Sequence, residues 1–137
     1  PARFALLAPI ARGKHHGKVK HWEHFNDLVK PLRDKGIEPI VFPSLREEAL
    51  AKAACPDATI LPPTTLGNFA AIAKRAQVVI ANDSGVSHIA AAVGAKQITL
   101  VGVTDTKRTG PWNPDAIVLG ENGRWPSVDE VIDNLPF

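Results

Sequence analysis

The 137-residue sequence lacks methionine and tyrosine and contains a single cysteine, Cys55. One cysteine excludes a disulfide framework and is typical of a reducing compartment, so we expect a cytoplasmic protein. The length is that of a single domain. Because the chain starts at Pro1 and has no methionine, we expect it to be one domain of a longer protein.

Long apolar runs and an excess of charge of one sign are also missing. No run approaches the roughly 20 apolar residues of a transmembrane helix, and no charged-then-apolar leader stands at the start. Lys plus Arg number 16 and Asp plus Glu 14, and the resulting net charge of +2 is too small to indicate a nucleic-acid-binding protein. Neither the glycine fingerprint of NAD-binding domains nor the P-loop motif occurs, which disfavours both classes.

Short apolar runs alternate with segments of helical period. We expect six strands, over residues 4–8, 37–42, 58–61, 77–81, 97–101 and 116–119. We expect helices over residues 21–35, 44–54, 66–75 and 84–93, and a last one that Ser127 caps. This alternation predicts an α/β fold, a Rossmann-like doubly wound parallel sheet in the order 3-2-1-4-5-6. The ligand crevice of such a sheet lies between the segments after strands 1 and 4, here residues 9–21 and 82–88.

The segment after the fourth strand has the composition of an anion site. A helix is expected to start there, so the N–H groups of Ser84, Gly85 and Val86 lack helical partners and carry the positive end of the dipole. Gly85 lets a ligand oxygen approach the backbone, and His88 adds an imidazole donor. The alternative is that Asp83 or Ser84 serves only as a helix cap.

The segment after the first strand is basic. Residues 12–22 carry four Lys or Arg and three of the five histidines, with a fourth at His24, and Lys20 stands directly before the expected helix. Such a local field suits a phosphate or diphosphate, although a solvated basic loop is the alternative. His15, His16, His21 and His24 are possible imidazole ligands, but no cysteine or carboxylate set completes a metal site of known spacing, so we expect no metal.

An acidic residue stands just beyond the second expected strand. Glu47 stands at the position where an acidic residue of doubly wound folds accepts hydrogen bonds from ribose hydroxyls, and Glu48 is a second candidate. Glu47 is also the fourth residue of a capping box that begins at Ser44, which is its structural alternative. Cys55 has no base beside it and is interpreted as a core residue at a helix end.

Residues 79–94, VIANDSGVSHIAAAVG, resemble the signature of the glycosyltransferase family 9 heptosyltransferases. The likeness continues through residues 98–105 and 110–112, and upstream through residues 20–22 and 65–72. It covers nearly all of the chain. The sequence departs from the family after the first strand, where residues 10–12 replace a hydroxyl-rich turn and residues 14–17 lengthen the loop.

The resemblance implies one half of a GT-B glycosyltransferase. Residues 1–137 resemble its second, nucleotide-sugar-binding domain, and the acceptor domain that precedes it in the family is absent from this chain. Family members transfer heptose from ADP-heptose to the lipopolysaccharide inner core, with inversion and without a metal cofactor, at the inner face of the inner membrane. Their acceptor is the lipid A–core oligosaccharide. Their catalytic base is an acidic residue of the first domain, so no catalytic base is implied here.

The resemblance also implies roles for single residues. Lys20 and His88 would bind the donor diphosphate and stabilise its charge as it leaves. Ser84, Gly85 and Val86 would offer backbone donors to the phosphates, and Asp83 would meet the sugar. Glu47 would hold the ribose and Leu66 would lie near the adenine. Two other hypotheses stay open: a stand-alone nucleotide- or anion-binding module without catalysis, and another GT-B enzyme such as a sugar-nucleotide epimerase.

Overall fold

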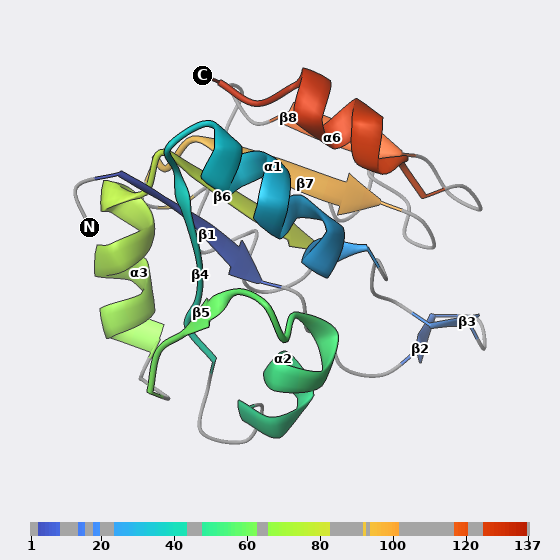
Figure 1. Cartoon of the computed structure of the whole chain (residues 1–137). Coiled ribbons are helices and arrows are strands. Elements are labelled where there is room, and N and C mark those ends of the chain that lie inside the picture. Colours follow the sequence, from blue (N-terminus) through green and yellow to red (C-terminus); the bar gives the residue numbers. More distant parts are fainter. Residues whose placement is uncertain are drawn as a thin grey trace.

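A computed structural model describes residues 3–8, 14–15, 18–19, 24–43, 48–62, 66–82, 92, 94–101, 117–120 and 125–136. Six parallel strands form the main sheet: β1 (Phe4–Ala8), β4 (Glu38–Val41), β5 (Thr59–Ile60), β6 (Val78–Asn82), β7 (Gln97–Val101) and β8 (Ile117–Gly120). Their order is β5-β4-β1-β6-β7-β8, so the predicted doubly wound order 3-2-1-4-5-6 is confirmed (Figure 1). A separate antiparallel pair consists of β2 (Lys14–His15) and β3 (Lys18–Val19).

Helical segments cover both faces of the main sheet (Figure 1). They are η1 (Phe25–Leu28), α1 (Val29–Asp34), α2 (Glu48–Ala54), α3 (Leu66–Arg75) and α6 (Val128–Asp133). One core cluster lies between the sheet and η1, α1, α2 and α6, and includes Leu7, Phe25 and Ile80. The second lies on the opposite face beneath α3, and includes Leu6 and Phe69. Adjacent strand residues alternate between these clusters, as the pleat requires.

The first helix starts differently from the prediction. The apolar residues Phe25, Leu28, Val29 and Leu32 are buried as expected, but Phe25–Leu28 form a 3-10 turn and the α-helix begins only at Val29. Pro31 explains this because it has no N–H, and in a continuous α-helix its ring would meet the carbonyl of Asp27. Starting the α-helix at Val29 puts Pro31 in its first turn, where the missing N–H costs little.

Gly36 ends this helix, as predicted. Its φ of +77° is in the left-handed region that favours glycine. The N–H of Gly36 donates to the Arg33 carbonyl at 2.9 Å and that of Ile37 to the Leu32 carbonyl at 3.0 Å, the two bonds of a Schellman motif. The chain is thereby turned directly into β4.

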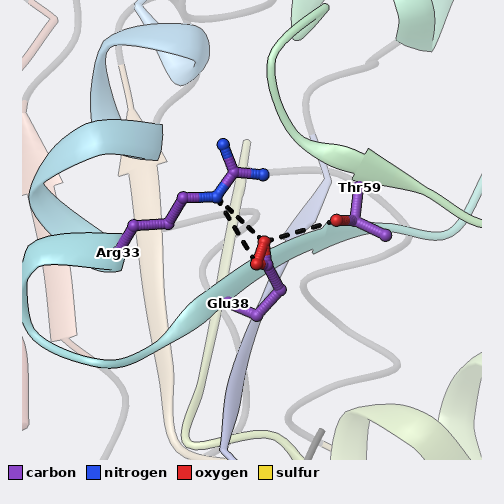
Figure 2. Close-up of polar contacts among 3 residues, drawn as sticks. All are labelled: Arg33, Glu38 and Thr59. Carbon is purple, nitrogen blue, oxygen red and sulfur yellow. Dashed lines mark hydrogen bonds and ion pairs between the residues drawn. The ribbon is translucent and has the colours of Figure 1, made fainter.

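A charged cluster stands at the amino ends of β4 and β5 (Figure 2). The Arg33 Nε donates to Glu38 Oε1 at 2.9 Å and lies 3.4 Å from Oε2, and the Thr59 hydroxyl donates to Oε1 at 3.3 Å. The Arg33 side chain is 45% exposed, so solvent screens the pair and its contribution to stability is small. The cluster joins α1, β4 and β5 at the edge of the sheet opposite the predicted crevice.

The last helix has the predicted capping box. The Ser127 hydroxyl accepts from the Glu130 N–H at 3.1 Å, and the Ser127 N–H donates to Glu130 Oε1 at 3.4 Å. We expect Ser127→Ala to lower the free energy of unfolding by about 1 kcal/mol, because one N–H at the helix start loses its acceptor. Urea unfolding measures this change. Ser127→Asp is the control that keeps an acceptor, and equal stability of all three proteins would contradict the assignment.

Candidate functional site

The strand order reverses between β1 and β6. β1 pairs with β4 on one side and with β6 on the other, and the chain winds away from β1 in opposite directions in the two halves of the sheet. Ala8, the last residue of β1, is in register with Ala81, one residue before the end of β6. The segments that follow these strands therefore leave the sheet from adjacent positions. This is the geometry in which open α/β sheets bind ligands outside the carboxyl edge.

Most of the predicted site residues fall outside the described part of the chain: Lys20, Glu47, Asp83, Ser84, Gly85, Val86 and His88. Leu66 is the first residue of α3, but its side chain is also outside the description. The described strands and helices nevertheless fix where the neighbouring residues of the chain lie. Asp83 follows directly after β6, Lys20 directly after β3, and Glu47 directly precedes α2. Their roles stay predictions.

Part of the basic segment forms a hairpin that was not predicted. Lys14 is in register with Val19 and His15 with Lys18, so residues that we interpreted as a loop pair as β2 and β3. A signal was present, because two residues, His16 and Gly17, separate the strands, and an X-Gly pair is typical of a tight hairpin connection.

A pair of hydrogen bonds fixes the helix that follows Lys20. Asn26 of η1 donates through Nδ2 to Asp57 Oδ2 at 2.9 Å, and its Oδ1 accepts from the Asp57 N–H at 3.0 Å. Asp57 lies in the connection between α2 and β5. The start of η1 is thus tied to the end of the α2 segment, so the elements that follow Lys20 and Glu47 are held together.

Metal binding by the described residues finds no support in their arrangement. The Nδ1 atom of His24, one of the four histidines considered above, lies 3.1 Å from Asp27 Oδ2, and both side chains are exposed. Among the described residues no three His, Cys, Asp or Glu side chains gather as a metal site would require. His15, His16 and His21 contribute no described side chain to this comparison.

Cys55 is the buried core residue that was predicted at the end of α2. Burial raises the pKa of its thiol to about 11, from 9.0, because the thiolate would lose its hydration. A pKa raised on folding favours the folded state below pH 9, and this contribution is lost between about pH 9 and 11. We therefore expect Cys55 to resist a thiol reagent at pH 8 and to react once urea unfolds the protein. Rapid modification of the folded protein would contradict this burial.

Asn82 was placed in the loop, and the structure corrects this: it is the last residue of β6 and its side chain is fully buried. The polar side chain made the apolar run appear to end at Ala81. Asn82 is in register with Leu100 of β7. It therefore lies inside the sheet, directly before Asp83 and the predicted phosphate donors of residues 84–86.

A hollow of about 480 Å³ also occurs at the amino edge of the sheet. Its walls include Val78, Gln97 and Ile117, the first residues of β6, β7 and β8. This edge is opposite the carboxyl ends of β1 and β6, so the hollow is separate from the predicted crevice.

Comparisons with known proteins agree with this geometry. The family model of glycosyltransferase family 9 (heptosyltransferase) matches residues 2–134. The chain belongs to this family. Lipopolysaccharide heptosyltransferase 1 of Escherichia coli O18:K1:H7 is 31% identical over 110 residues, which cover 76% of this chain and 34% of that protein. The chain thus spans about a third of the length of the curated relatives it matches.

Solved heptosyltransferase structures share the fold of this family 9 chain. E. coli heptosyltransferase WaaC with ADP superposes with a TM-score of 0.76 at 27% identity, over 89% of this chain and 39% of that one. The same enzyme with ADP-2-deoxy-2-fluoro heptose has a TM-score of 0.72 and covers 89% of this chain and 38% of its own. Within the described residues, no helix is long and apolar enough to cross a membrane.

Proposed function

We propose that this chain is the nucleotide-sugar-binding half of an inverting heptosyltransferase of the GT-B type, with an ADP-heptose-like donor. The observation that carries the proposal is the switch point, where β1 and β6 end side by side and where the segment after β6 reads Asp83-Ser84-Gly85. Membership of family 9 supports the reaction class. The related WaaC structures, solved with ADP and with an ADP-heptose analogue, support the donor.

In this reaction the nucleotide-sugar-binding half would stabilise the leaving diphosphate. Glycosyl transfer builds positive charge on the sugar and negative charge on the departing phosphates. The N–H groups of Ser84, Gly85 and Val86 and the side chains of Lys20 and His88 would meet that negative charge. Preorganised donors of this kind lower the barrier without a metal ion.

The remaining contacts would select the donor. Glu47, at the start of the α2 segment, would accept hydrogen bonds from the ribose hydroxyls. Leu66, the first residue of α3, would lie near the adenine, and Asp83 would contact the sugar. In the sequence Glu47 precedes β5 and Leu66 follows it, and β5 pairs with β4, the neighbour of β1.

We assign the catalytic base to a separate acceptor half, which would bring the lipid A–core oligosaccharide to the donor. The part of the relative that aligns with this chain is 34% of its length, which leaves room for such a half. Association with the inner face of the inner membrane would then follow from the lipid acceptor.

A donor-consumption assay tests this function in the complete protein that carries the chain. ADP release from ADP-heptose is expected to depend on the lipid-linked acceptor, with one heptose transferred per ADP. Acceptor-independent conversion of the donor to an isomer would indicate a sugar-nucleotide epimerase. ADP binding without donor consumption, with or without the acceptor, would indicate a binding module. Either result would contradict the proposal.

A further inference from the structure

Burying the carboxamide of Asn82 lowers the stability of the fold if the side chain only fills space in the core. Asn82 is two residues beyond Ile80 and four beyond Val78 in β6, so its side chain lies on the same face of the sheet, which η1 and α1 cover. The apolar residues Ile80, Leu100 and Phe25 form the core cluster on that face. An amide within such a cluster destabilises the fold unless its polar atoms are hydrogen-bonded.

Its position limits which groups it can hold. Asn82 is at the carboxyl end of β6, where the segments after β1 and β6 leave the sheet. A carboxamide offers two N–H donors and one oxygen acceptor, so it can bind a carbonyl of one segment and an N–H of another. Leucine has neither function, and an ionised aspartate only accepts.

Gln97 and Thr99 are also buried polar residues of the sheet, but they bond to each other within one strand. Gln97 donates through Nε2 to the Thr99 hydroxyl at 3.1 Å, within the same strand β7. Thr99 is fully buried like Asn82, but it alternates with Ile98 and Leu100 and so lies on the opposite face. It is one strand away from Asn82 and is in register with Ala81. Thr99 is therefore a matched control.

We propose that Asn82 is a positioning residue for the phosphate-binding segment 83–88. Its carboxamide anchors the backbone at the carboxyl ends of β1 and β6, so that the N–H groups of Ser84, Gly85 and Val86 are held in the geometry that a diphosphate requires. This inference rests on the proposed function. It adds a residue that does not touch the donor but determines how strongly the phosphates are bound.

Asn82→Leu separates this role from a structural one. Leucine has the same branched shape and is apolar, so the variant is expected to keep the fold, as judged by circular dichroism and urea unfolding. Its affinity for ADP is expected to fall about tenfold, because the phosphate donors lose their anchor. Affinity for adenosine, which has no phosphate, is expected to stay within about twofold of the parent. Thr99→Val is expected to leave both affinities unchanged.

Two measurements keep the outcomes distinct. Calorimetric titrations with ADP and adenosine compare the parent, Asn82→Leu, Asn82→Asp and Thr99→Val. Amide hydrogen exchange of residues 83–88, which needs no ligand, is expected to accelerate in both Asn82 variants and not in Thr99→Val. A parent that fails to bind ADP would overturn the proposed function, while the exchange data would still test the anchor. Exchange and ADP affinity in Asn82→Leu equal to those of the parent would overturn this inference.

Discussion

Alanine at Lys20 should slow heptose transfer by about 100-fold in the complete enzyme, and alanine at His88 should have a similar effect. Each substitution removes one donor to the charge that develops on the leaving diphosphate, and loss of one such donor costs on the order of 3 kcal/mol of barrier. Affinity for ADP should fall as well, because free ADP carries the negative charge that develops on the diphosphate during transfer.

The chain offers matched controls for both substitutions. Lys30 lies on the exposed face of α1 and pairs with Asp34 at 3.0 Å, with 86% of its side chain exposed. His24 is exposed and pairs with Asp27. Lys30→Ala and His24→Ala should leave transfer within about twofold of the parent, as surface substitutions away from a site generally do. Transfer rates for Lys20→Ala and His88→Ala equal to those of these controls would refute the site assignment.

Phe25→Ala should lower the free energy of unfolding by about 3–5 kcal/mol. The Phe25 ring is 1% exposed and belongs to the core cluster that joins η1, α1 and the sheet. Truncation removes its buried surface and leaves a cavity beneath the first turn after the basic segment. Because a domain is stabilised by only about 5–15 kcal/mol, such a loss is a large part of the total.

Urea unfolding followed by circular dichroism measures this change, and Leu50→Ala is its control. Leu50 on α2 is 50% exposed, so its truncation should cost well under half as much as that of Phe25. A loss below about 1 kcal/mol for Phe25→Ala would show that η1 is not packed on the sheet as described.

The main sheet was predictable because its parallel strands are buried on both faces. A strand of this kind appears as an apolar run, and β1 is such a run with the predicted bounds. β7 also has the predicted bounds, although Gln97 and Thr99 interrupt its apolar residues. The bounds of α3 also agree, since residues 62–65, PPTT, mark its start in the sequence. Alternating strands and helices commonly form a doubly wound sheet, and the order predicted from that arrangement is correct for all six strands.

The differences arise where a tertiary or backbone constraint overrides the apolar pattern. Pro31 divides the predicted first helix into a 3-10 turn and an α-helix, although its apolar face continues without interruption. Asn82 is polar and yet buried, so hydropathy ended β6 one residue early. The β2–β3 hairpin has no apolar alternation at all, and only its two-residue connection indicated it.

The candidate site was predictable in its location more than in its contacts. The switch point follows from strand order, and the residue types in the segments after β1 and β6 indicate a phosphate ligand. Which oxygen each donor meets depends on backbone geometry of a few tenths of an ångström. Residue spacing along the chain does not contain that information.

A crystal structure of the protein with ADP tests the central claim most directly. The account predicts the diphosphate outside the carboxyl ends of β1 and β6, within hydrogen-bond distance of the N–H groups of Ser84, Gly85 and Val86 and of the side chains of Lys20 and His88. ADP bound instead in the hollow at the amino edge, against Val78, Gln97 and Ile117, would contradict it.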